Sequence, residues 1–346
     1  MVKGEVNSLC IFKMHNGALG WVEFGPQLLI IRKKDWGIIH TSTNYHTVMD
    51  HSGAEKLSNT TKMLEFAVRR ISDPAVTSVD DLHQVWLEKG EYFPRIWRGY
   101  NGGRPFVDNF DLLNPFAVYG GEINGSVVAA ESLLMEVKEL FRSVEPHVDN
   151  DASYGHRMRE LLILLCTEVE ANLVSVLKQN FPIMVENAKG YLKTKHYQVL
   201  RDVMFLDKYV VGLADYKDRR FSPFQNWVGP DRSTESIPWY AAYNSVKHDR
   251  ETNFSCASMS NVLNAAAALH ILQIAQWGGG LFHLLGSGRK SIYEIDEQPR
   301  IPLGEIYVPQ TSATDDRRIP SSQNVFDRPL PYEQFIDRQF SAISGK

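Results

Sequence analysis

The stretch PWYAAYNSVKHDRETNFSCASMSNVLNAAAALHILQIAQW, residues 238–277, decides the fold of the second half of this chain. From Ser258 to Trp277 it has no charged residue and is rich in Ala, Leu and Ile, and Ala and Leu are strong helix formers. Apolar residues fall on every side of this helix, so we expect it at the centre of a helical bundle. Glycines 278–280 are expected to end it. The polar residues that interrupt the run exclude a membrane span: Ser260, Asn261, Asn264, His270, Gln273 and Gln276.

A polar cluster precedes this helix and consists of Asn244, Lys247, His248, Asp249 and Arg250. Asn244 and His248 are four residues apart, so they project from the same side of a helix. A histidine titrates near neutrality, and cations beside it suit a phosphate. An ordinary solvated helix end carries similar charges, so the residue types alone leave both interpretations open.

The pattern Y-N-x-x-K-H-D-R before a long apolar helix resembles the HEPN superfamily of helical-bundle domains. Upstream, RELLILLCTEVEANL (residues 159–173) looks like an earlier helix of the same bundle, and the resemblance covers roughly residues 127–277. In many members an Arg, a polar residue, three variable residues and a His form an RNase site that dimerisation completes. Asn244 fits the polar position and His248 the histidine, whereas Tyr243 stands where the arginine is expected. Arg250 or Arg159 could take its place in space.

The resemblance implies a metal-independent endoribonuclease, acting as a bacterial toxin or an anti-phage defence effector. It implies a homodimer that acts on RNA without a cofactor, with an antitoxin or regulatory protein as a further partner, and the widely spaced cysteines suit a reducing cytoplasm. The catalytic candidates are His248, Asn244, Arg250 and Lys247, and the substrate-binding candidates are Arg219, Arg220, Tyr243 and Asp249. The alternative is a non-catalytic HEPN-like module that binds RNA, a nucleotide or a protein. Tyr243 in place of arginine favours this alternative.

The expected fold class is α+β, with a mainly helical HEPN-like bundle after a smaller mixed domain. We expect the mixed domain at residues 1–126, the bundle at 127–285 and a Pro-rich extended tail at 286–346, and the glycine-rich segment 120–126 marks the first boundary. Short runs of alternating or β-branched residues predict strands at 19–24, 27–32 and 36–41. Apolar spacing predicts helices at 59–71, from 78 onward, at 158–179 and at 195–209, with no strand inside 127–277 and an irregular segment at 218–236.

Composition narrows the classes of function. The chain has 346 residues and a formal net charge of −4, which argues against non-specific coating of nucleic acid. Its three cysteines lie far apart and form no metal pattern, as suits a reducing compartment. His40, His46, Asp50 and His51 match no standard zinc spacing and are predicted to lie in a polar loop, so we expect no metal.

A cluster of arginines and aromatic residues, and a pair of glutamates, could each belong to a functional site or only stabilise the fold. Arg219 and Arg220 stand among Phe221, Phe224 and Trp227, and such mixtures either stack bases or anchor a loop. Glu168 and Glu170 are predicted to pair with Arg159 or with cations near His248, as structural ion pairs or as part of a site.

Overall fold

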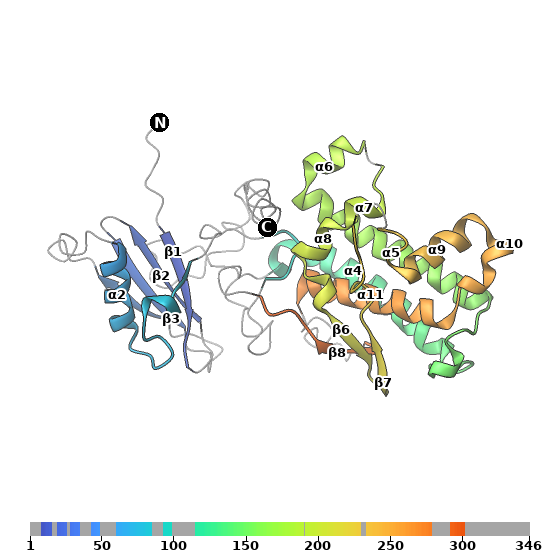
Figure 1. Cartoon of the computed structure of the whole chain (residues 1–346), viewed down its shortest axis with the longest axis horizontal. Coiled ribbons are helices and arrows are strands. Elements are labelled where there is room, and N and C mark those ends of the chain that lie inside the picture. Colours follow the sequence, from blue (N-terminus) through green and yellow to red (C-terminus); the bar gives the residue numbers. More distant parts are fainter. Residues whose placement is uncertain are drawn as a thin grey trace. The chain divides into compact units, whose positions relative to one another are not determined.

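The computed structural model describes residues 8–15, 19–25, 28–34, 43–48, 60–84, 93–98, 115–189, 191–229, 233–278 and 291–301. The chain divides into two compact units. The sheet unit comprises Met1–Tyr92, Arg98–Asn114 and Arg300–Lys346, and the helical unit comprises Phe93–Trp97 and Pro115–Pro299. Both contain an antiparallel sheet, and helices dominate the second, so the chain belongs to the mixed α+β class (Figure 1).

The sheet unit is an antiparallel sheet in the order β4-β3-β2-β1-β5 with helix α2 packed against it. Its elements are β1 Ser8–Lys13, β2 Leu19–Gly25, β3 Leu28–Lys34, β4 Thr43–Val48, α2 Thr60–Ile71 and β5 His83–Gln84. Gly25 pairs with Leu28, so β2 and β3 form the hairpin that the Gly-Pro turn signal predicts.

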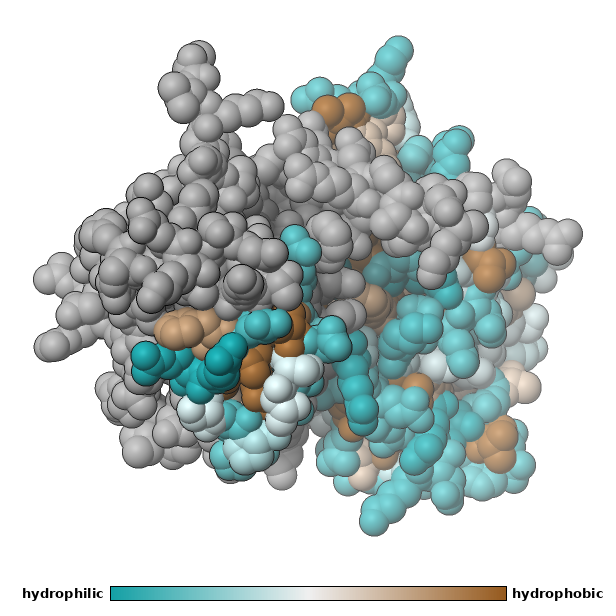
Figure 2. All heavy atoms as spheres, turned by 60° about the vertical axis from the view of Figure 1, so that its left-hand side comes forward, coloured by the Kyte–Doolittle hydropathy of each residue, from teal (hydrophilic) through white to brown (hydrophobic). Residues whose placement is uncertain are grey.

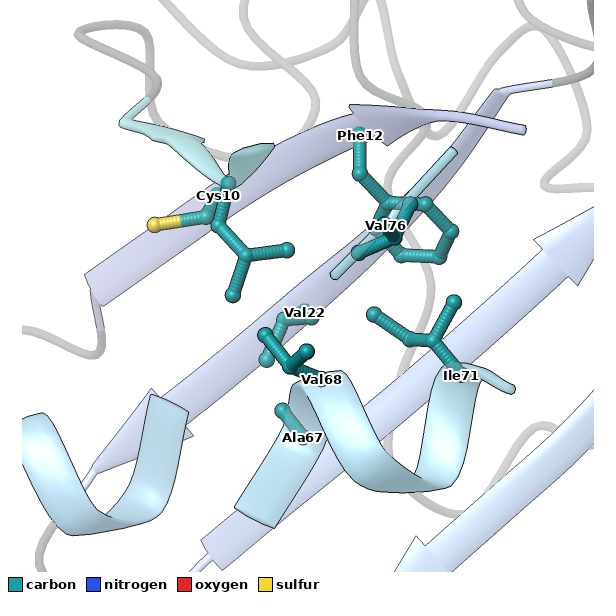
Figure 3. Close-up of a cluster of buried hydrophobic side chains, with 8 residues drawn as sticks. Cys10, Phe12, Val22, Ala67, Val68, Ile71 and Val76 are labelled. Carbon is teal, nitrogen blue, oxygen red and sulfur yellow. The ribbon is translucent and has the colours of Figure 1, made fainter. Parts of the chain in front are cut away.

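A small apolar core joins α2 to the sheet. Cys10 and Phe12 alternate along β1 and meet Ala67, Val68 and Ile71 of α2 (Figure 3). This spacing puts the strand residues on one face of the sheet and the helix residues on one face of α2. The structure confirms the predicted strands at 19–24 and 27–32 and the predicted helix at 59–71.

Three predictions for this unit need correction or lie outside the described residues. The window 41–52 is not all loop, because β4 occupies Thr43–Val48 and places His46 opposite Ile31 in the sheet; Tyr, Val and the β-branched Thr favour strand there. The helix predicted from 78 is only a 3-10 turn, Val79–Asp81, followed by β5. The predicted strand 36–41 lies outside the described residues.

The helical unit is built around α11, Met259–Trp277, which packs against α5, His156–Asn180, α4, Pro115–Leu140, and α9, Pro238–His248. Ala265 to Ala268 are all fully buried, which lets neighbouring helices approach closely. The Ser258 hydroxyl accepts from the Asn261 N–H at the start of α11, and Gly278 ends it with φ +100°. The prediction of a buried central helix is confirmed.

A second antiparallel sheet, in the order β7-β6-β8, completes this unit. Its strands are β6 Val210–Leu213, β7 Tyr216–Phe221 and β8 Tyr293–Glu297. The expectation of a strand-free bundle over 127–277 is therefore wrong, because β6 and β7 pair within it. The two valines of β6, with an inward-facing Leu213, favour a half-buried strand there.

Two other boundaries also differ from the sequence prediction. The glycine-rich segment 120–126, predicted as a boundary, lies inside α4. Burial of Ile123 and Val127 stabilises the helix there despite Gly121 and Gly125. The helix predicted at 195–209 is divided into α7 Thr194–Tyr197, α8 Val199–Val203 and a 3-10 turn, Leu206–Lys208, with Phe205 in the left-handed region at φ +54°.

The expected C-terminal tail begins later than residue 286, because β8 pairs with β6 as part of the helical unit's sheet. The rest of the expected tail, from residue 302, lies outside the described residues. The face shown in Figure 2 is mostly hydrophilic over its described part, with hydrophobic side chains scattered across it. Scattered hydrophobic residues of this kind are normal for a protein surface.

Candidate functional site

The catalytic candidates lie where α9 ends and the short helix α10, Arg250–Asn253, begins; we call this the α9–α10 corner. Pro238 is the first residue of α9, a position whose N–H has no partner within a helix, so proline loses no hydrogen bond there. Trp239, Tyr240, Tyr243 and Val246 form the buried face of α9. The sequence thus places an aromatic face inward and leaves the polar last turn of α9 at the surface.

The last turn of α9 presents the predicted catalytic side chains to solvent. Lys247 and His248 are exposed, and Asn244, one turn before His248, is half-buried. Arg250 is the first residue of α10. Asp249 caps α10, because its carboxylate accepts the Thr252 N–H at 3.1 Å. That hydrogen bond lowers the pKa of Asp249, so the structure gives this predicted substrate-binding residue a capping role.

A partly buried series of hydrogen bonds runs from α5 to Lys247. The Glu170 carboxylate accepts from the Tyr240 hydroxyl and, at 3.3 Å, from the Tyr243 hydroxyl. Lys247 Nζ donates to the Tyr243 hydroxyl at 3.0 Å. The predicted pairing of Glu170 with a cation near His248 is therefore not found, because the Tyr243 hydroxyl lies between Glu170 and Lys247 and binds both. These hydrogen bonds hold α9 against α5 and orient the Lys247 ammonium.

The protonation states follow from this arrangement. The hydrogen bond to Tyr243 raises the pKa of Lys247, and the negative charge of Glu170 adds to the effect, so Lys247 stays charged at neutral pH. Burial raises the pKa of Tyr240, and its hydrogen bond to Glu170 raises it further. Burial beside Glu170 also raises the pKa of Tyr197 to about 12. Both phenols therefore remain neutral at neutral pH, and the Tyr240 hydroxyl donates to Glu170.

Tyr243 occupies the motif position of the arginine and is only 1% exposed. Its hydroxyl is already engaged by Glu170 and Lys247. The structure thus gives Tyr243 a positioning role behind Lys247, whereas the sequence predicted a residue that contacts substrate.

Arg219 and Arg220, the other predicted substrate-binding residues, lie on β7 and are paired with carboxylates. Arg219 forms a two-pronged ion pair with Asp151, with one N–O distance of 3.1 Å, and lies over the Phe221 ring. Arg220 Nε lies 3.1 Å from the Asp296 carboxylate. These contacts fit the structural interpretation of the cation–aromatic mixture, in which both arginines anchor the β-hairpin.

A second polar network, which the sequence did not reveal, crosses the bundle between α4, α5 and α11. Asn172 Oδ1 accepts from Ser126, Gln273 and Gln276, at 2.9, 3.2 and 2.9 Å. Its amide donates to the Glu168 carboxylate at 2.9 Å. Burial raises the pKa of Glu168, and the Asn172 hydrogen bond offsets part of that rise. The sequence signal was the pair of amide residues Gln273 and Gln276 within the uncharged helix α11.

Arg159, considered as a substitute for the missing arginine, lies half-buried near the start of α5. Its Nε is buried and makes no hydrogen bond. The pairing of Arg159 with Glu168 or Glu170, one of the sequence predictions, is therefore not found; those carboxylates bind Asn172, Tyr240 and Tyr243 instead.

The thiols, possible metal sites and helix lengths of the described residues complete the picture of the site. Cys10, Cys166 and Cys256 are free thiols. No three His, Cys, Asp or Glu side chains in this part of the chain are grouped to bind a metal ion. None of its helices combines the length and apolarity that a bilayer span requires. Comparison with protein-family models, with curated proteins and with solved structures found no match to this chain.

Proposed function

We propose that the helical unit is a HEPN-like, metal-independent endoribonuclease whose site is the α9–α10 corner. The observation that carries the proposal is an exposed His248 one turn after Asn244 and directly beside Lys247. Lys247 is held by the Tyr243 hydroxyl and kept charged. An acid–base group next to a fixed cation is what cleavage of a phosphodiester requires.

In the proposed reaction the 2′-hydroxyl of the RNA attacks the neighbouring phosphorus. The bond from the 2′-oxygen to phosphorus forms, the bond to the 5′-oxygen breaks, and the products end in a 2′,3′-cyclic phosphate and a 5′-hydroxyl. His248 takes the proton of the 2′-hydroxyl as a base and, once protonated, gives a proton to the leaving 5′-oxygen. Lys247 and Arg250 meet the negative charge that develops on the phosphate.

Assembly is part of the same proposal. HEPN-like sites usually face each other across a two-fold axis, so the proposed active form is a homodimer with His248 close to its symmetry mate. Light scattering should then give twice the monomer mass at micromolar concentration, and a monomer alone would contradict this part. A toxin or defence role with a controlling partner protein belongs to the same proposal.

One observation favours a second function, a non-catalytic module that binds RNA or nucleotide. The motif arginine is replaced by Tyr243, which is buried and engaged by Glu170. Such a corner can bind a phosphate through Lys247 without accelerating its cleavage.

Incubation of the purified full chain with RNA separates the two functions. We expect wild-type protein to cleave tRNA or single-stranded RNA in EDTA and to leave 2′,3′-cyclic phosphate ends, because the 2′-hydroxyl is the nucleophile. DNA of the same sequence is the matched control and should remain intact, since it lacks that hydroxyl. Binding of RNA without any cleavage would exclude the nuclease and leave the binding module.

A further inference from the structure

Arg159 differs from the other half-buried arginines of the helical unit in having no counter-charge. Arg201 pairs with Asp202 and Asp207, and Arg219 with Asp151. The Nε of Arg159 is buried without a hydrogen bond, as are those of Arg201 and Arg219, but over the described residues the Arg159 guanidinium, unlike theirs, makes no ion pair. A partly desolvated charge without a partner destabilises a fold. A cost of this kind is typical of residues retained for function.

The direction in which Arg159 faces follows from its neighbours along α5. Three residues before it, the His156 ring lies 4.9 Å from the Phe254 ring, measured between centroids. Eleven residues after it, Glu170 binds Tyr240 and Tyr243. Spacings of three and eleven residues keep His156, Arg159 and Glu170 on one side of a helix.

The chain that covers this side of α5 contains the α9–α10 corner. Tyr243 and Phe254 both contact α5, and His248 and Arg250 lie between them in sequence. Arg159 lies about 5 Å along the α5 axis from His156 and about 16 Å from Glu170. Figure 1 shows α9 leading to α10 at the end of the unit where α5 begins. Helical spacing therefore places Arg159 on the side of α5 that contacts Tyr243 and Phe254, the residues that flank the corner in sequence.

We infer that Arg159 is the phosphate-binding arginine of the α9–α10 corner, supplied by α5 in place of the arginine that Tyr243 replaces on α9. The ligand class is the phosphodiester of single-stranded RNA, and the inference deepens the proposed function on which it rests. The planar guanidinium donates two parallel hydrogen bonds to a phosphate, which supplies the acceptors that the fold does not. Lys247, oriented by Tyr243, adds a point charge on the same ligand.

The test compares Arg159→Gln with Arg157→Gln by fluorescence anisotropy with a labelled single-stranded RNA. Arg157 is the matched control, because it lies two residues away, is exposed and pairs with Glu136 and Glu160. We expect Arg159→Gln to weaken binding about ten- to a hundred-fold. It should also reduce the slope of log affinity against log salt by about 0.7, the value for one phosphate of a single strand. Arg157→Gln should change neither quantity.

Melting curves distinguish a binding role from a structural one. Arg159→Gln should melt no lower than wild type, because the guanidinium it removes has no partner in the fold. Equal RNA affinity of wild type and Arg159→Gln, equal losses for both arginine variants, or no RNA binding by wild type would each overturn the inference. Loss of binding by Arg159→Gln in a protein that never cleaves RNA would uphold it and reject the nuclease. If Arg159→Gln binds RNA as tightly as wild type and still cleaves it, the inference about Arg159 is wrong and the nuclease proposal stands.

Discussion

Replacing His248 with alanine is expected to lower RNA cleavage about a hundred- to ten-thousand-fold, the usual loss when a general acid or base is removed. The His248 side chain is exposed on the last turn of α9, so its removal leaves no cavity and should not change the melting temperature. The measurement is the rate of cleavage of one RNA in EDTA, recorded beside a thermal melt of the same preparation.

Three further substitutions show whether the loss of cleavage is specific to His248. His147→Ala is a suitable control, because His147 is also exposed and contacts Asp149 in its own turn; it should cleave at the wild-type rate. Arg250→Ala should also reduce cleavage, and Lys247→Ala should reduce it less, since a single point charge is replaced more easily. Equal rates for wild type and His248→Ala would remove His248 from the mechanism.

Replacing Asn172 with leucine is expected to destabilise the helical unit by roughly 3–5 kcal/mol, a large part of the stability of an ordinary domain. Asn172 is 3% exposed and serves as acceptor for Ser126, Gln273 and Gln276. Leucine accepts no hydrogen bond, so these buried donors lose a partner and the Glu168 carboxylate loses a donor.

The check is a urea titration of both proteins, followed by circular dichroism. Ala171→Leu, at the exposed neighbouring position, is the control and should alter stability by less than about 0.5 kcal/mol. A midpoint for Asn172→Leu equal to that of wild type would show that the polar network contributes nothing to the stability of the bundle.

The central helix could be predicted from the sequence because its signal is local. An uncharged run followed by glycines needs no tertiary information, and α11 begins and ends where that signal places it. Helix α4 could not be predicted in the same way. Gly121 and Gly125 disfavour helix locally, and burial of Ile123 and Val127 against the bundle reverses that preference.

The candidate site was predictable in part. Helical spacing places Asn244 and His248 on one side of α9, and the structure leaves Lys247 and His248 exposed there. The partners of Glu170 were not predictable, because Tyr240 and Tyr243 lie some seventy residues away in sequence. Nor does sequence show that Arg219 is already paired with Asp151 and that Arg159 has no such partner.

Crosslinking of RNA to the full chain tests the central claim, that the α9–α10 corner is the site of RNA contact, most directly. The His248→Ala protein would be irradiated with RNA containing 4-thiouridine and the crosslinked peptides identified by mass spectrometry. We predict crosslinks within residues 239–254 and 156–163, which hold the corner and Arg159. Crosslinks confined to β7 or to the sheet unit would contradict the claim.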